Sequence, residues 1–374
     1  MRFDRRTNLP CLVVLALALA QRTLAADTNL VIGNWRIDDG SLNNALPDHD
    51  IRFGFDVAGI GDINGDGLPD IAVGSREDDT DGPLRGSIWV IFLDANGNEL
   101  APSPLKFSDA TRDPLNKLQL ESNSGSNLGS LFGDGIARLP DFDGDAIDEL
   151  KLAVGATGAD PGAAPEDSGA IYLVDIDRST WTISDVVTLA SGSPNMPTLA
   201  AESRSGFSVR NLGDWDGDGA PEIGLSSHFD DDGGTDNGAF YILYLKPDGT
   251  GVKTWKKISA TQGGFDGSLD GSANFGAHLT PIGDLDGDEQ VDLAVGATGD
   301  GTDGSAFVLF MDSGCAVNTT TIPHPSCAVK PGAVKITEAL NGFTGPLQTG
   351  GAFGDSFAWL SGNRLVVSAD LADG

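Results

Sequence analysis

Four short acidic segments of the chain carry side-chain oxygens at alternating positions, the arrangement with which a loop surrounds a hard cation. The first segment, "GDINGDGLPDIAVGS" at residues 61–75, places them at positions 1, 3, 5 and 9 counted from Asp62. Ca²⁺ takes about six to eight oxygen ligands at flexible geometry, and a backbone carbonyl and water would complete the shell. Mg²⁺ requires a stricter octahedron, and softer metals prefer His or Cys. The pattern therefore predicts Ca²⁺ as the bound ion.

The same spacing recurs in three later segments of the chain. The predicted metal ligands are Asp62, Asn64, Asp66 and Asp70 in the first loop, Asp141, Asp143, Asp145 and Glu149 in the second, Asp214, Asp216, Asp218 and Glu222 in the third, and Asp284, Asp286, Asp288 and Asp292 in the fourth. In the second loop Asp148 is an alternative to Glu149, because two residues are inserted in that segment. Position 6 is glycine in the first and third loops but Ala146 and Glu289 in the others, which departs from the pattern.

Position 12 of each loop separates this pattern from a helix-loop-helix calcium switch. An EF-hand requires a bidentate glutamate there, and a dockerin also continues into a helix with an acidic twelfth position. Here position 12 is apolar in all four loops: Val73, Leu152, Leu225 and Val295. Both helical alternatives are therefore rejected. Two others stay open: an ordinary solvated acidic turn, since Asp and Gly favour turns, and a calcium ion that only stabilises the hairpin.

The elements around the loops repeat along the chain. Five segments align in register, with repeat cores that begin near residues 53, 132, 205, 275 and 353, and the fifth has lost its acidic loop. In each repeat, short apolar runs such as "DIAVG" and "GSIWVIFL" alternate with Gly- and Asp-rich turns, which is typical of strands rather than helices. Up to four such runs per repeat predict an all-β fold, a β-propeller of four-stranded blades.

The two ends of the array bear on the number of blades. The stretch "NWRIDDGSL" from Asn34 resembles the fourth-strand segment "TWKKISATQ", and the last copy stops at Gly374 after its second apolar run. We expect one propeller domain over residues 30–374. Either its ring is small and has a degenerate closing blade, or the chain lacks further repeats, which is the favoured interpretation.

The first 25 residues predict a signal peptide. Arg2, Arg5 and Arg6 precede an apolar run, and small residues near Ala25 offer a cleavage site. Because the apolar run is too short to span a bilayer, we expect an exported protein without a transmembrane segment in the mature chain. It would be secreted, periplasmic or associated with the cell surface. In such a compartment Cys315 and Cys327 are expected to form a disulfide, with a metal pair or two free thiols as alternatives.

The composition limits the classes of partner. A formal net charge of −32 argues against nucleic acid and against anionic membrane surfaces, because both require Lys and Arg on the protein. With 40% hydrophobic residues the chain has enough apolar side chains to build a core. Cations are therefore the natural partners of this surface.

The repeated motif "FG…VA…GDINGDGLPDIAVGS…G(S/A)" resembles the FG-GAP repeat, the blade unit of the integrin alpha-subunit β-propeller. The resemblance covers roughly residues 35–374. It implies a seven-bladed ring of which about five repeats are visible here, Ca²⁺ in the loops on one face, and a role in ligand binding and adhesion. Two departures are that Ser205 stands where the other copies have Phe, and that the fifth copy has no acidic loop.

The expected function is an extracellular or cell-surface module for adhesion or ligand binding, with a protein or glycan as the partner. The alternatives are a secreted hydrolase or lyase, or its accessory domain, built on such a propeller, and a purely structural scaffold. We expect no catalysis, because His49, His228, His278 and His324 fall at unrelated repeat positions and the chain contains no G-x-S-x-G or HExxH motif. Trp215 is expected to be exposed and suited to stack on a sugar, whereas Trp35, Trp89 and Trp255 are expected in the core.

Overall fold

The computed structural model describes residues 51–122, 128–145, 147–162, 164–338, 347, 350–360 and 364–371. The predicted signal peptide (residues 1–25), the fourth-strand segment from Asn34, His49 and Ala146 lie outside the described residues.

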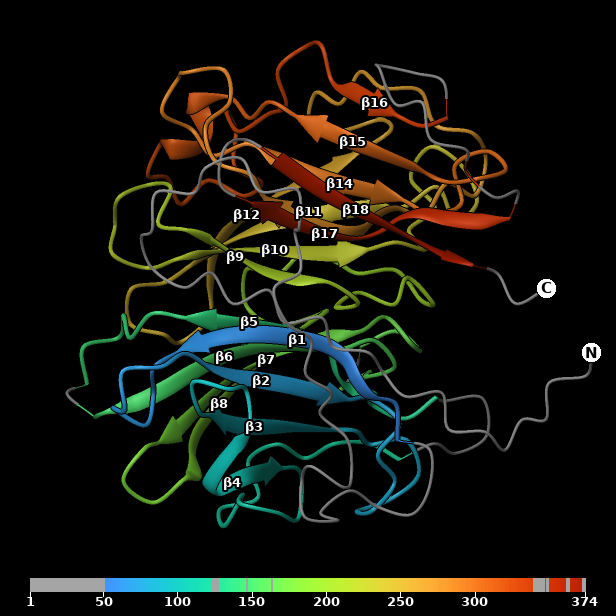
Figure 1. The fold of residues 1–374 in the computed structure, drawn as a ribbon. Helices are drawn as coiled ribbons and strands as arrows, with labels where there is room; N and C mark the ends of the chain where they lie inside the picture. Colours follow the sequence, from blue (N-terminus) through green and yellow to red (C-terminus); the bar gives the residue numbers. More distant parts are fainter. Residues whose placement is uncertain are drawn as a thin grey trace, which may run out of the picture.

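The described chain is all-β and forms four-stranded antiparallel sheets that are the blades of a β-propeller, as the sequence predicted (Figure 1). Blade 1 contains β1 (Phe53–Gly61), β2 (Asp70–Ser75), β3 (Ser87–Leu93) and β4 (Glu99–Phe107), and blade 2 contains β5 (Phe132–Leu139), β6 (Glu149–Ala156), β7 (Ala170–Asp177) and β8 (Thr182–Ala190). Blade 3 contains β9 (Val209–Gly213), β10 (Glu222–Ser227), β11 (Ala239–Leu245) and β12 (Val252–Ser259), and blade 4 contains β13 (Phe275–Pro281), β14 (Leu293–Ala297), β15 (Ser305–Leu309) and β16 (Val334–Ile336).

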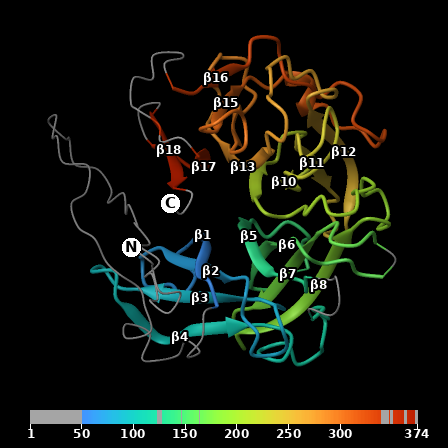
Figure 2. The same cartoon turned by 90° about the vertical axis from the view of Figure 1, so that its right-hand side faces the viewer.

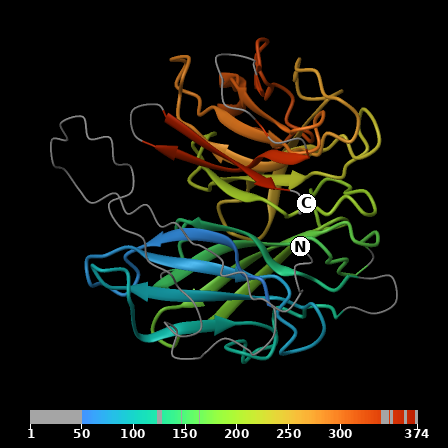
Figure 3. The same cartoon turned by 45° about the vertical axis from the view of Figure 1, so that its right-hand side comes forward.

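The fifth repeat contributes a two-stranded sheet, β17 (Gly351–Leu360) and β18 (Arg364–Leu371). Figure 3 shows this red hairpin alongside the orange strands of blade 4. The view in Figure 2 shows the blades around a common centre, with β1, β5 and β17 on the inside and β4, β8, β12 and β16 on the outside.

The middle strands of the blades are almost entirely buried, and blades 2, 3 and 4 each pack between two neighbouring sheets. All seven residues of β3 and of β11 are buried, and so are all six of β2 and of β10. This explains why these segments are near-continuous apolar runs in the sequence. The outer strands β4 and β8 alternate between buried and more exposed positions, as expected for a sheet edge that is partly solvated.

Glycines set the distance between neighbouring blades. A Cβ atom on Gly155 in β6 would lie 1.9 Å from the carbonyl oxygen of Gly206, which belongs to the next blade. In the same way, a Cβ on Gly74 would lie 2.0 Å from the carbonyl oxygen of Gly133. A Cβ on Gly296 would lie 2.1 Å from the carbonyl oxygen of Gly354. The repeated glycines of the "AVG" and "FG" motifs therefore allow backbone of one blade to touch backbone of the next.

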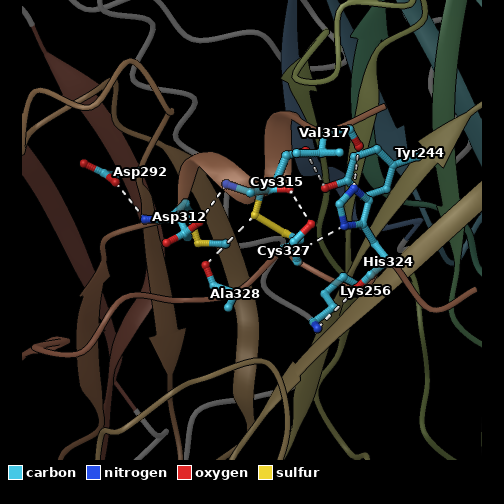
Figure 4. The surroundings of a disulfide bond; sticks show 12 residues. Tyr244, Lys256, Asp292, Asp312, Cys315, Val317, His324, Cys327 and Ala328 are labelled. Carbon is cyan, nitrogen blue, oxygen red and sulfur yellow. Dashed lines mark hydrogen bonds between the residues drawn. A yellow bond between two sulfur atoms is a disulfide. The ribbon is translucent and has the colours of Figure 1, made fainter. Parts of the chain in front are cut away.

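The disulfide predicted between Cys315 and Cys327 is present in blade 4, at the 3₁₀ turn η1 (Ser313–Ala316) (Figure 4). The Tyr244 hydroxyl donates to the carbonyl of Cys315 at 3.0 Å, and the Cys327 amide donates to Nδ1 of His324 at 3.1 Å. The imidazole of His324 also stacks on the ring of Tyr244, with 4.7 Å between centroids. His324 therefore has a structural role beside the disulfide.

Candidate metal centres

Each of the four acidic loops connects the first strand of a blade to the second strand. The loops lie between β1 and β2, between β5 and β6, between β9 and β10, and between β13 and β14. Because the blades repeat the same antiparallel order, all four loops lie at the same end of their blades.

The carboxylate at position 1 organises the turn. Asp284 accepts hydrogen bonds from the amides of Gly287, Asp288 and Glu289 at 2.7, 3.2 and 2.9 Å. These backbone donors, that of Glu289 first, hold the pKa of Asp284 below its usual range. Asp62 and Asp214 accept the same three bonds in the first and third loops.

Position 6 tolerates glutamate in the fourth loop. Glu289 adopts φ 72°, the left-handed conformation that Gly67 and Gly219 adopt at this position with φ 88° and 96°. The residue carries backbone strain, because left-handed φ is uncommon without glycine. The turn itself is nevertheless preserved, so the departure noted in the sequence does not remove it.

The carboxylate at position 9 ties the loop to the interior of its blade. Asp70 is fully buried and accepts hydrogen bonds from the amides of Ile63 and Leu93, both at 3.1 Å. Asp292 does the same with the amides of Leu285 and Met311 at 2.8 and 2.9 Å. In each case one amide donor belongs to loop position 2, and the other belongs to a residue at or just beyond the end of the third strand. This carboxylate therefore anchors the loop to the third strand.

Glu222 occupies position 9 of the third loop. One of its oxygens, Oε2, accepts from the amide of Trp215. Burial raises the pKa of Glu222 to about 9, and the neighbouring Asp216 and Asp214 add to the rise. The folded chain alone therefore favours a protonated Glu222 at neutral pH.

The structure gathers carboxylates in three of the four loops. Oxygen atoms lie within 4.8 Å of one another in the sets Asp141, Asp143 and Glu149; Asp214, Asp216 and Asp218; and Asp284, Asp286 and Asp288. Asp145, Glu222 and Asp292 are outside these sets. In the second loop Glu149 joins the set, whereas Asp148 is exposed and pairs with Arg178 at 2.6 Å.

The first loop is arranged differently. The Asn64 side-chain amide donates to Oδ2 of Asp66 at 3.1 Å, and its oxygen accepts from the amide of Asp66 at 2.9 Å. Its polar side chains are therefore partly bonded to one another.

A lysine ammonium lies among the carboxylates of the second, third and fourth loops. Lys151 contacts Asp143 at 2.7 Å, Asp175 at 2.9 Å and also Glu149. Lys253 lies 2.5 Å from both Asp216 and Asp218. Burial alone would lower the pKa of Lys151 and of Lys253, but hydrogen bonds to the loop carboxylates raise both above the usual value.

Lys330 plays the same part in the fourth loop. It lies 2.6 Å from both Asp286 and Asp288. The hydrogen bonds to these two carboxylates raise the pKa of Lys330. All three lysines therefore remain positively charged at neutral pH.

The third loop still contains carboxylate oxygens that its lysine does not satisfy. Oδ1 of Asp216 and Oε1 of Glu222 are buried and have no hydrogen-bond partner within the part of the chain that the structure describes. Buried carboxylate oxygens without a partner are unfavourable, and a hard cation is the partner they suit. The donor set of this loop therefore fits Ca²⁺ chemically.

A pocket of about 550 Å³ lies beside the first loop, between blades 1 and 2. Its lining includes Trp181, Phe92, Pro102 and Arg178, together with Asn64 and Asp66 of the loop. Phe92 supports Trp181, with 5.0 Å between ring centroids. Arg178 donates through Nε to the carbonyl of Ile63 at 3.1 Å, which holds one wall of the pocket against the loop.

The structure corrects the prediction for Trp215. This side chain is only 9% exposed, packs in the core of blades 3 and 4, and donates from Nε1 to the carbonyl of Leu212 at 2.7 Å. It is not a free surface for a sugar. The half-buried Trp181 of the pocket, which the sequence did not single out, is an aromatic side chain beside the first loop.

Two histidines lie against one phenylalanine ring although their repeat positions differ. His228 and His278 both pack on Phe207, with 4.7 and 5.2 Å between ring centroids. Burial lowers the pKa of His228 to about 3 and that of His278 to about 4, so both are neutral at neutral pH. Nearby, Arg210 of blade 3 pairs with Asp56 of blade 1 at 3.0 Å.

None of the helical segments in the described ranges is long and apolar enough to cross a membrane.

The FG-GAP repeat family matches residues 53–91. Integrin alpha-PS2 of Drosophila melanogaster is 25% identical over 245 residues, which cover 63% of this chain and 14% of that protein. Integrin alpha-2 of Mus musculus is 28% identical over 180 residues, which cover 48% of this chain and 14% of that protein. The chain thus spans about one seventh of the length of these relatives.

A solved structure of a rhamnogalacturonan lyase aligns with a TM-score of 0.32 and 16% identity, over 68% of this chain and 46% of that one, and this similarity is too low to carry an argument. The repeat match spans β1, the first acidic loop, β2 and most of β3. The chain thus contains an FG-GAP repeat match in its first blade, and its β-propeller resembles that of integrin alpha subunits.

Proposed function

We propose that this chain is an exported calcium-binding β-propeller that binds a protein or glycan ligand outside the cell or at its surface. The resemblance to integrin alpha subunits supports a binding role. The observation that carries the proposal is the pocket beside the first loop, because it joins an aromatic wall to two predicted calcium ligands, Asn64 and Asp66.

The chemistry of the pocket favours a glycan. Its volume of about 550 Å³ is within the range of small-ligand sites. Aromatic faces such as that of Trp181 stack on the apolar C–H face of a sugar ring. Around it, Asp148, Arg178 and Ser179 offer hydrogen bonds to hydroxyl groups. A mixed aromatic and polar lining of this kind suits a sugar better than a purely apolar ligand.

Ligand binding is expected to depend on both calcium and Trp181. A glycan and extracellular-protein array probed with the purified chain should give saturable signals that fall when calcium is chelated, because Asn64 and Asp66 belong to both the pocket and the loop. Trp181→Ala should weaken binding at least about fivefold, since a ring stacked on an aromatic side chain contributes about 1–3 kcal/mol. Trp255→Ala, a change of another half-buried tryptophan outside the pocket, is the matched control.

Two outcomes would contradict this proposal. If the binding signals were unchanged in Trp181→Ala, the pocket would not be the binding site. Turnover of an ester or glycoside by the purified chain would instead support the alternative of a secreted hydrolase or lyase. We include no catalytic step, because the described histidines 228, 278 and 324 are engaged in packing.

Removing calcium is expected to destabilise the propeller. Each predicted site brings several carboxylates together, and without a cation their repulsion opposes folding. A chelator should lower the melting temperature by several degrees, roughly what a loss of 1 to 2 kcal/mol gives for a domain of this size. Calcium added back in excess should restore it. An unchanged melting curve, with no calcium found by elemental analysis, would disprove calcium binding.

A further inference from the structure

The lysines in the acidic loops are the feature that the calcium proposal does not account for. We propose that Lys151, Lys253 and Lys330 are built-in counter-ions that compete with Ca²⁺ for the second, third and fourth loops. The four loops then bind calcium in two classes, and the first loop fills at the lowest calcium concentration. This inference rests on the proposed calcium binding.

The lysines occupy the place where a metal ion would be held. In the third loop the ammonium of Lys253 lies 2.5 Å from the carboxylates at positions 3 and 5, and in the fourth loop that of Lys330 lies 2.6 Å from the carboxylates at the same positions. A cation shared by those two carboxylates would have to displace the ammonium. In the second loop Lys151 bridges positions 3 and 9.

Lys253 and Lys330 both belong to the segment of chain that follows the third strand of their blade. The register between β11 and β12 shifts between Tyr244 and Leu245, because Lys253 forms a bulge there. A bulge redirects a side chain, and here the side chain extends to the third loop. In blade 4 the amide of Lys330 donates to the carbonyl of Phe310, just beyond β15, at 2.7 Å. Both lysines therefore enter from the fourth-strand side of their blade.

Blade 1 has no such lysine. Its fourth strand pairs Phe92 with Leu100 and Leu93 with Glu99, and its register shift lies just before them, where the inserted residues 101–104 are Ala-Pro-Ser-Pro and include no lysine. Across the described ranges, no lysine or arginine forms an ion pair with Asp62, Asp66 or Asp70. Two arginines lie beside this loop: Arg178 donates to the backbone carbonyl of Ile63, and the guanidinium of Arg138 lies against Gly61. A cation entering the first loop therefore displaces no ammonium.

The lysines compete with calcium without replacing it fully. One ammonium cannot neutralise the three aspartates that the third loop brings together, and Oδ1 of Asp216 and Oε1 of Glu222 have no partner beside it in the described chain. The third loop therefore still has carboxylate oxygens that a cation can bind. The tethered ammonium lowers the affinity of the loop because it must leave before the metal binds.

Calorimetric titration of the full chain with Ca²⁺ tests the inference. The natural sequence should bind one ion strongly and up to three more weakly. In the triple variant Lys151→Met, Lys253→Met, Lys330→Met, the weak class should tighten at least about tenfold, because methionine keeps much of the side-chain length and removes the charge. Lys335→Met is the matched control, since Lys335 pairs with Asp300, outside the loops, at 2.6 Å.

Two further variants keep the test decisive. If the triple variant does not fold, Lys330→Met alone should strengthen one weak site. Its side chain is 25% exposed, against 4% for Lys151 and 8% for Lys253, so this substitution disturbs packing least of the three. Asp66→Ala should abolish the strong step and leave the weak ones.

The outcomes separate this inference from the calcium proposal. Four equal sites in the natural sequence, weak sites unchanged by the lysine variants, or a strong step that survives Asp66→Ala would each overturn the inference while leaving calcium binding intact. No binding to the natural sequence and none to any lysine variant would overturn calcium binding itself.

Discussion

Replacing Gly155 with alanine is expected to destabilise the propeller by about 3 kcal/mol, at the upper end of the cost of overpacking a buried site. The added Cβ would lie 1.9 Å from the carbonyl oxygen of Gly206 and 2.8 Å from its carbonyl carbon. Both atoms are backbone, so no side chain can move aside to relieve the clash. Blades 2 and 3 would have to separate locally, which urea unfolding would detect as a lower midpoint.

Gly59→Ala is the matched control for Gly155→Ala. Gly59 also lies in a strand, but a Cβ there meets nothing within 4 Å and its φ is not left-handed. This substitution should change stability by less than about 0.5 kcal/mol. If both variants unfolded at the same urea concentration, close contact between blades would not be the reason for the glycine.

Asp292→Ala is expected to cost about 3 kcal/mol of stability when measured in the presence of a chelator. The change removes both acceptors of the amides of Leu285 and Met311 in a fully buried site, and each buried amide left without a partner is unfavourable. Burial raises the pKa of Asp292, so its charge opposes part of what its hydrogen bonds contribute.

Asp292→Asn separates the two effects. The amide keeps one acceptor oxygen, so we expect a loss of stability between those of the natural sequence and Asp292→Ala. Thermal melting with chelator present measures the hydrogen bonds, and the same melt with calcium adds any contribution of the metal. Equal melting temperatures for Asp292→Ala and the natural sequence in chelator would mean that this carboxylate does not anchor the loop.

The strands and their grouping could be predicted from the sequence because the information is local. Apolar runs of strand length, bounded by Gly- and Asp-rich turns, recur in register, and the structure forms strands at these runs. Ser205 shows why a departure from the motif did not matter: it is fully buried and bridges Gly169 just as Phe132 bridges Gly86 in the preceding pair of blades. The backbone contact, not the aromatic ring, is what the position requires.

The candidate site was only partly predictable, because several of its determinants are distant in sequence. Lys253 is 37 residues from Asp216 and Lys330 is 44 residues from Asp286, so no local motif joins them. A bulge also cannot be placed from composition. Trp215 was predicted on the surface because it stands at position 2 of the third loop, yet its indole turns inward to the carbonyl of Leu212. Alternation of polar residues in a loop does not indicate which side chains face the core.

The outer edges of the blades bear on how this chain avoids self-association. Each fourth strand ends its sheet and could accept a strand from another molecule. β4 contains Pro102 and Pro104, which have no amide hydrogen to donate, and β16 has only three residues. The edge of β12 is partly covered, because the amide of His324 donates to the carbonyl of Trp255 at 2.6 Å. A protein made of many sheets is thus protected from forming intermolecular β-structure by a different device on each of these edges.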